Sequence, residues 1–391
     1  MSLKHVLFID SFAGSFFNFL INFILLKLVG DEVVVTYGLA MTYSLVITSF
    51  LRMILFQPFN VLYINVDGAL NEFFFAFITY FFAALFILIL FYFISPGFLS
   101  FYLLLTVFSY IAIHEFYRLA LIGLGLPYLI LFSPFIICFY LLLSVVNSLF
   151  DFDTFLFLMA VCSAFELFCF MVVSFFKAGG MNVYNLSLDT FLDRYFDFYN
   201  LKSRLLSSLL QLSIVHLPFV FISFFLASNL ASSVFIFRSL FQPVQIVIKT
   251  LDTLKSKMIS GAKDKKKFVG DNIRVFILSS LLIGLLCFFS GFLILYNFFD
   301  YEIDFYLISS LICWFFVFVF MSLIRPVEFF QVYLSRYRGM NFSYFLALIV
   351  LLMSLGFIYF FDCYKFISFA IMLSWFSLAI FQLNWLRFVK C

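Results

Sequence analysis

Apolar residues run along this chain in long blocks that short polar or charged stretches separate. A helix needs about 20 apolar residues to cross the hydrocarbon core of a bilayer, and the blocks have this length. The pattern therefore predicts twelve membrane-spanning helices, with ten or eleven as alternatives because the separators around the fourth and fifth are weak. The predicted spans lie near residues 6–29, 33–56, 73–95, 98–120, 126–147, 154–176, 205–228, 231–254, 274–299, 305–327, 341–361 and 366–388.

Composition supports a chain that is almost entirely embedded in the membrane. Of its 391 residues, 66% are hydrophobic and only 11% are charged, whereas a soluble domain carries about 25% charged residues. Twelve spans use roughly 240 positions, which leaves no room for a catalytic domain outside the membrane. The net charge is only +3, so we expect no nucleic-acid partner.

Motifs of enzymes and metal sites are missing from the sequence. The seven cysteines stand singly, without CxxC pairs or closely spaced histidines, and are expected to be small apolar core residues. No GxxxxGK[ST], HExxH or GxSxG motif occurs either. We therefore expect a transporter rather than an enzyme, with no cofactor and no metal.

Lysine and arginine are distributed unevenly between the predicted loops. The N-terminus, the loops after even-numbered spans and the C-terminus hold 18 of them, and the loops after odd-numbered spans hold 2. Cytoplasmic loops retain positive charge, so both termini are expected in the cytoplasm. The basic stretch 255–274 would also attract the anionic lipids of the cytoplasmic leaflet. The three remaining basic residues lie within spans and are Arg52, Arg238 and Lys249.

Two short sequence echoes indicate a duplicated half. LRMILFQP at 51–58 resembles FRSLFQP at 237–243, and EFY at 115–117 resembles EFF at 328–330. Both echoes link spans that are six apart, so the halves would be parallel repeats. The prediction is a six-helix bundle over 1–200, a hinge at about 177–204 within it, and a second bundle over 201–391.

The chain resembles the multidrug/oligosaccharidyl-lipid/polysaccharide exporter superfamily, and within it most closely the Wzx-type polysaccharide flippases. The features that carry this resemblance are Leu28-Val29-Gly30, Tyr37-Gly38, the twelve predicted spans and the basic loop after span eight. It implies two six-helix bundles around a central cavity, which is the fold of multidrug and toxic compound extrusion (MATE) transporters. It also implies a bacterial inner-membrane protein that moves lipid-linked saccharides and works with other polysaccharide-assembly proteins.

Span eight carries the most prominent polar stripe. Arg238, Gln242, Gln245, Lys249 and Asp252 follow one another at helical spacing, so on a straight helix they share one face. That face would form a cationic wall for a pyrophosphate or an anionic sugar. Alternatively, Lys249 and Asp252 extend to the interface and Arg238 pairs with a carboxylate.

Polar residues in spans one and two are further candidates for substrate binding. Arg52 is the repeat counterpart of Arg238, with extension to the interface as the alternative. Asp10, Gly14, Asn18 and Asn22 recur every four residues in span one, and Asn18 and Asn22 are expected to contact substrate. The alternative for the Asn and Gly positions is helix packing.

Titratable residues within spans are candidates for coupling to H⁺ or Na⁺. Glu166 lies in the middle of span six and His216 in the middle of span seven, and Asp10 lies one turn inside span one. A hydrogen-bonded pair that only fixes helix packing is the alternative for Glu166 and His216. The alternative for Asp10 is an ordinary anion at a helix N-terminus.

Charged residues near cytoplasmic span ends could close the inward face through salt bridges, or they could simply be solvated. These gate candidates are Glu115, Arg118, Arg325 and Glu328, with His114 beside them.

Three functions compete at this stage. The leading one is a flippase for undecaprenyl-pyrophosphate-linked oligosaccharide, the repeat unit of O-antigen, capsule or exopolysaccharide, working by alternating access. A cation-coupled MATE-type multidrug exporter is the alternative, and it would need an acidic cavity. A membrane-embedded polysaccharide polymerase or glycosyltransferase ranks last, because every predicted outer loop is short.

Overall fold

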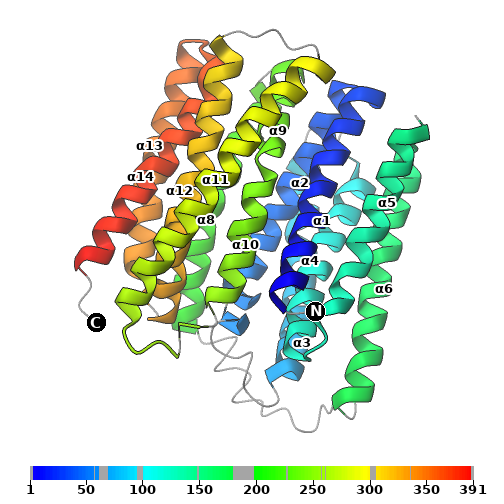
Figure 1. Cartoon of the computed structure of the whole chain (residues 1–391), viewed down its shortest axis with the longest axis vertical. Coiled ribbons are helices and arrows are strands. Elements are labelled where there is room, and N and C mark those ends of the chain that lie inside the picture. Colours follow the sequence, from blue (N-terminus) through cyan, green and yellow to red (C-terminus); the bar gives the residue numbers. More distant parts are fainter. Residues whose placement is uncertain are drawn as a thin grey trace. The chain divides into compact units, whose positions relative to one another are not determined.

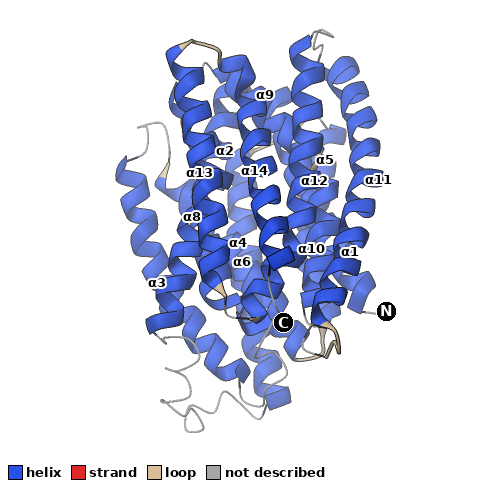
Figure 2. Cartoon of the chain, turned by 90° about the vertical axis from the view of Figure 1, so that its left-hand side faces the viewer, coloured by secondary structure: helices blue, strands red, loops and turns tan. Residues whose placement is uncertain are grey.

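The computed structural model of the chain is helical over nearly all the residues that it describes, and no strand occurs among them (Figure 2). The described residues are 3–388 except Gln57, 61–68, 95–99, Ser148, 179–197, 226–227, Lys257, Ser260, 300–304 and Ser335.

The first half of the chain contains the helices that precede residue 179 (Figure 1). Two of them, α1 and α2, continue into short π-helical turns, η1 and η2. The elements are α1 (Leu3–Ile24), η1 (Leu25–Val29), α2 (Asp31–Leu51), η2 (Arg52–Phe56), α3 (Ala69–Ile94), α4 (Phe101–Gly123), η4 (Pro127–Leu131), α5 (Phe132–Asn147) and α6 (Phe152–Ala178).

The second half of the chain has the same helical character, with one long helix of 35 residues, α11. Its elements are α8 (Phe198–Phe225), α9 (Ser228–Leu240), α10 (Gln242–Ser256), α11 (Lys265–Phe299), α12 (Phe305–Tyr333), α13 (Tyr337–Phe360), η6 (Tyr364–Phe366) and α14 (Ile367–Phe388).

Helices long and apolar enough to cross a membrane account for most of the predicted spans. Ten pass by length and composition among the described residues, and the bent pair of α9 and α10 makes eleven. The predicted span 6–29 coincides with α1 and η1, where the apolar helical stretches are two shorter ones, His5–Gly14 and Leu20–Val29. The predicted all-helical, polytopic architecture is confirmed.

Span eight differs from the single straight helix that the sequence predicts. It breaks at Phe241, and its two parts, Ala231–Leu240 and Gln242–Ser256, meet at 51°. Pro243 follows directly after the break. Proline has no N–H to donate to the preceding turn and fits best in the first turn of a new helix, which explains why α10 starts here.

By its internal contacts the chain divides into two units. Unit 1 comprises residues 1–13 and 36–209, and unit 2 comprises residues 14–35 and 210–391. In unit 1, α4 packs along α6, and in unit 2, α12 packs along α14. These are the fourth and sixth predicted spans and the tenth and twelfth, so equivalent helix pairs pack within each half.

Phenylalanine builds the interior of unit 1 as well as its surface. The ring centroid of Phe116 on α4 lies 4.2 Å from that of Phe77 and 5.1 Å from that of Phe73, both on α3. Stacking at these separations adds to the free energy gained from burial. The opposite face of α3 exposes Phe82 and Phe93, as expected for a helix that faces lipid.

Asp151 caps the start of α6. The backbone N–H and the hydroxyl of Thr154 both donate hydrogen bonds to Asp151 Oδ2, the former at 3.1 Å. These hydrogen bonds favour the ionised carboxylate and lower the pKa of Asp151.

The close packing of α11 on α12 yields a prediction about stability. A Cβ at Gly284 would lie 2.8 Å from Phe315 Cε2, so Gly284→Ala should destabilise the fold by about 1–3 kcal/mol through overpacking. Gly356→Ala is the matched control, because a Cβ there meets nothing within 4 Å and helix propensity should stabilise it by up to about 1 kcal/mol. Thermal unfolding in one detergent compares the two variants. A melting temperature of Gly284→Ala equal to that of the unchanged chain would contradict the close approach.

Candidate functional site

A histidine on α4 bridges two buried carboxylates in unit 1. The Nδ1 atom of His114 lies 2.7 Å from Glu166 Oε1 on α6, and its Nε2 atom lies 3.2 Å from Asp10 Oδ1 on α1. Glu166 is 0% exposed and Asp10 is 3% exposed. Three helices therefore meet at one imidazole ring. Along the chain, His114 is 52 residues from Glu166 and 104 residues from Asp10.

The hydrogen positions in this network are constrained by its chemistry. An ionised carboxylate only accepts hydrogen bonds, whereas a neutral imidazole has one N–H. If both Asp10 and Glu166 are ionised, His114 must carry two N–H hydrogens and be cationic. If the ring is neutral, one of the two carboxyl groups must hold the proton. These two states hold the same number of protons and differ only in which atom carries one of them. If that proton is lost, a single imidazole N–H faces two ionised carboxylates, so one of the two hydrogen bonds between the helices must break.

Arg118 extends the network by one helical turn along α4. Its Nη2 atom donates to Glu115 Oε1 at 2.7 Å, and its Nη1 atom lies 3.9 Å from Asp10 Oδ2. His114 and Arg118 are four residues apart and share a face of α4. Three acids and two bases thus form one connected group, which we call the α1–α4–α6 network: Asp10, His114, Glu115, Arg118 and Glu166.

The network joins residues to which the sequence assigned separate roles. Asp10 and Glu166 were expected to couple ions, and Glu115 and Arg118 to form a gate. The sequence did not predict that His114 lies at the centre of this network, although its four-residue spacing to Arg118 was a usable signal. Because α4 extends to Gly123, these α4 residues lie inside the helix rather than at its end. Among the residues described, no group of three or more His, Cys, Asp and Glu side chains is arranged to hold a metal ion.

Arg238 forms a different kind of site in unit 2. Its guanidinium carbon lies 4.4 Å from the ring centroid of Phe219 on α8, a cation–π contact. Within the described part of the chain, no carboxylate lies at ion-pair distance from Arg238, so the expected alternative of a carboxylate partner has no support there.

His216 stands close to this cation. It precedes Phe219, the ring that contacts Arg238, by three residues on α8 and is 4% exposed. Its Nδ1 atom has no hydrogen-bond partner among the described residues. The packing alternative of a hydrogen-bonded pair therefore fits Glu166, through His114, but not His216 Nδ1.

The bend in span eight divides the predicted polar stripe. Arg238 lies before the bend and the other four residues lie after it, so the stripe on one straight helix is wrong. Gln242 and Gln245 are half-buried in the first turn of α10, and Lys249 is exposed. Asp252 interacts electrostatically with Arg325 on α12.

The other candidates in the first two spans lie in varied surroundings. The amide of Asn22 donates to Ser239 Oγ on α9 at 2.8 Å, which is the kind of contact that the packing alternative describes. Arg52 is half-buried and is the first residue of the π-helical turn η2. The backbone of Asn18 belongs to α1, but its side chain lies outside the described residues.

The remaining two gate candidates pair within one helix. Arg325 Nη1 donates to Glu328 Oε2 at 2.6 Å, and both residues belong to α12. The hydroxyl of Tyr344 on α13 donates to the other carboxylate oxygen of Glu328. The pair Glu115 and Arg118 has the same three-residue separation within α4, so in each half a salt bridge spans one turn of a single helix.

Comparison with known proteins gives one informative match. The chain aligns over 99% of its length with 95% of the solved chain in "Crystal structure of eukaryotic MATE transporter AtDTX14", with a TM-score of 0.67 and 13% sequence identity.

The chain has the MATE fold. No family model and no curated protein matches the sequence. At 13% identity the likeness concerns the fold alone, and it confirms the architecture that the sequence predicted. Any role within the MATE fold must come from this chain's own residues, above all the α1–α4–α6 network and Arg238.

The α1–α4–α6 network yields a prediction about coupled stability. Replacing one partner of a buried charged group leaves the others unpaired, so His114→Leu should destabilise the protein by about 3–5 kcal/mol. The double variant with Glu166→Leu removes the orphaned carboxylate as well and should recover much of this loss. Unfolding free energies of both single variants and of the double variant form the test. Simple addition of the two single effects would contradict the bridge.

Proposed function

We propose that this protein exports an anionic lipid-linked saccharide across a bacterial inner membrane. The observation that carries the proposal is Arg238, a cation in a predicted spanning helix for which the described residues supply no carboxylate. A charge within the membrane is costly unless a partner or ligand compensates it. The proposed cargo is an undecaprenyl-pyrophosphate-linked oligosaccharide of the kind used for O-antigen, capsule or exopolysaccharide.

The surroundings of Arg238 suit a pyrophosphate. A planar guanidinium can stack on an aromatic ring while its N–H groups fork onto phosphate oxygens, and Phe219 provides such a ring. The break in span eight places the first turn of α10 after Arg238, and helix N-termini of broken membrane helices favour anionic groups. Gln242 and Gln245 in that turn carry amides that can hydrogen-bond to saccharide hydroxyls.

The acidic residues of unit 1 favour an anionic cargo over a cationic one. Asp10 and Glu166 are engaged by His114, and Glu115 is engaged by Arg118. These bases offset part of the negative charge of the three carboxylates, which reduces their attraction for a cationic drug. Arg238 differs from them because the described residues supply no carboxylate for it, and it is the charge that we propose for an anionic ligand.

The α1–α4–α6 network is the proposed coupling site for H⁺, with Na⁺ as the other candidate ion. One proton decides whether His114 donates to both carboxylates or to one of them. A change in these hydrogen bonds alters what connects α1 to α4 and α6. We propose that this change drives an alternating-access cycle in a multi-pass protein whose two termini are cytoplasmic, without a catalytic step.

A cation-coupled multidrug exporter is the second candidate. It is favoured by the similarity in fold to a protein named as a MATE transporter, together with the two buried carboxylates at His114. The two candidates differ in the sign of the cargo's charge, so they can be separated by transport assays.

Removal of the Arg238 charge tests the anionic cargo. Arg238→Ala should lower glycan export about 10- to 100-fold in a strain that depends on this protein, since hydrogen bonds to a charged group contribute about 1.5–3 kcal/mol. Export by Arg238→Lys should lie between that of Arg238→Ala and that of the unchanged protein, because lysine keeps the positive charge but lacks the forked N–H groups of the guanidinium. Arg52→Ala is measured alongside, and Lys202→Ala at an exposed position in α8 is the control. Normal export by Arg238→Ala, at equal amounts of protein in the membrane, would overturn the proposal.

Removal of the Glu166 charge separates the two candidates. For a flippase driven through the α1–α4–α6 network, Glu166→Gln should reduce glycan export at least tenfold, and cells with the unchanged protein should show no efflux of a cationic dye. If Glu166→Gln instead abolished dye efflux and left glycan export intact, the multidrug exporter would replace the flippase. Both assays use the same cells, with equal amounts of protein in the membrane.

A further inference from the structure

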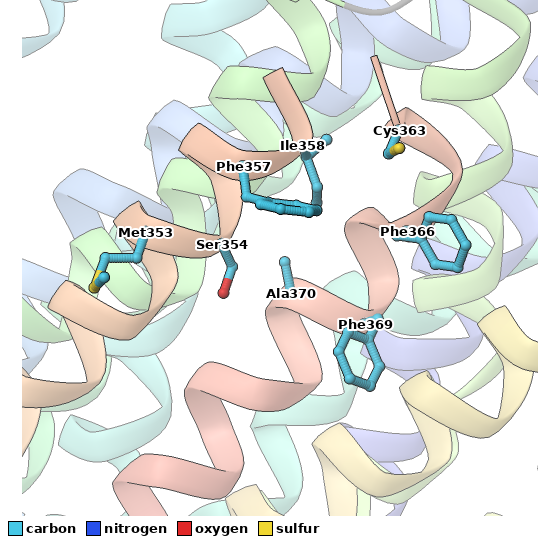
Figure 3. A pocket seen from close by; sticks show the side chains of 8 residues that line it. All are labelled: Met353, Ser354, Phe357, Ile358, Cys363, Phe366, Phe369 and Ala370. Carbon is cyan, nitrogen blue, oxygen red and sulfur yellow. The ribbon is translucent and has the colours of Figure 1, made fainter. Parts of the chain in front are cut away.

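A hollow of about 460 Å³ opens between α13 and α14 in unit 2 (Figure 3). Met353 and Phe357 line it from α13, and Phe366 and Phe369 line it from η6 and α14. The size lies within the range of about 300–1,000 Å³ that is typical of small-molecule sites. The hollow is therefore large enough to hold part of a ligand rather than a single water molecule.

The lining of the hollow is chemically apolar. Its two polar side chains are already engaged by the helix backbone, because Ser354 Oγ donates to Val350 O at 2.8 Å and Cys363 Sγ donates to Phe361 O at 3.2 Å. The other lining residues offer only carbon and thioether sulfur. A ligand in this hollow must therefore present hydrocarbon.

The hollow opens on the side of the helices that is exposed. Met353 is 72% exposed and Phe357 is 60% exposed, while Ile358 and Ala370 form a buried floor. Both helices belong to stretches long and apolar enough to cross a membrane. The medium around exposed apolar residues of such helices is the acyl-chain region of the bilayer.

The connection from α13 to α14, which contributes Cys363 to the lining of the hollow, carries one acid and one base. Asp362 and Lys365 are exposed in the connection from α13 to α14. Asp362 has a φ of 51°, a left-handed conformation that aspartate and asparagine tolerate better than most residues. Tyr359 near the end of α13 and Tyr364 in η6 lie close to this connection in sequence, and tyrosine is typical of the level of lipid headgroups.

We propose that this hollow binds a zwitterionic aminophospholipid, with phosphatidylethanolamine as the representative headgroup. Lys365 meets the phosphate, Asp362 accepts a hydrogen bond from the ammonium group, and the upper part of an acyl chain lies in the hollow. From Ile358 to Met353 the helix rises about 7.5 Å, which places the hollow directly below the headgroup level. A headgroup with only negative charge would meet Lys365 but would be repelled by Asp362. The site is separate from Arg238 and does not depend on the proposed cargo.

Lipid retention by the purified full-length chain tests the site. The detergent-solubilised protein is titrated with phosphatidylethanolamine, phosphatidylcholine or phosphatidylglycerol of the same acyl chains, and bound lipid is counted by native mass spectrometry. We expect phosphatidylethanolamine to be retained about fivefold better than the other two. Equal retention of all three lipids, or a preference for phosphatidylglycerol, would overturn the headgroup assignment.

Variants locate the binding. Ser354→Phe fills the hollow and should remove the retained lipid, whereas Ile349→Phe, at an exposed position on the same helix outside the hollow, should not. Ser354→Leu replaces it as the test variant if phenylalanine at this position prevents folding. Asp362→Asn keeps a side chain that tolerates the left-handed turn and should abolish only the preference over phosphatidylglycerol. Lys365→Gln should weaken retention of every phospholipid. Unchanged retention by a folded Ser354 variant would overturn the site.

Discussion

The need to compensate charge inside a low-dielectric environment determines how unit 1 is organised. Glu166 and Asp10 are buried on different helices, and His114 lies between them and contacts both carboxylates. The first residues of α1 belong to unit 1, where Asp10 bonds to His114 and the Ala13 carbonyl accepts from Cys138 Sγ at 3.3 Å. From Gly14 on, the same helix belongs to unit 2. Residues of α1 are therefore divided between the two units, and Asp10 lies in the part that belongs to unit 1.

The fold was largely predictable because membrane-spanning helices leave a strong signal in the sequence. The length of an apolar run and the charge of a loop can be read along the sequence, so they are recognisable without knowledge of any contact between helices. The break in span eight was not predicted. Pro243 was visible, but Pro218 and Pro326 lie within the continuous helices α8 and α12, so proline alone does not identify the helix that bends. Neighbouring helices decide whether the freed carbonyl groups can be satisfied.

The candidate site was predictable as residues but not as a network. A charge in a span is conspicuous, so Asp10, Glu166 and Arg238 could be found from sequence. Their partners are separated from them by many residues, and helical periodicity says which side chains share a face but not which faces meet. His114 therefore looked like one more residue near a span end. Asn22 had two open interpretations until its contact with Ser239 was seen.

The two halves differ in how their buried charges are compensated, although short sequence motifs relate the halves. In unit 1 the acids Asp10, Glu115 and Glu166 contact bases of the same unit, whereas the Arg238 cation of unit 2 has an aromatic ring and no described carboxylate. Under the proposed function, the two halves of a duplicated fold thus have different roles. Proton exchange needs carboxylates in contact with a base, which unit 1 provides. Anion recognition needs a cation that no internal acid neutralises, and Arg238 of unit 2 is that cation.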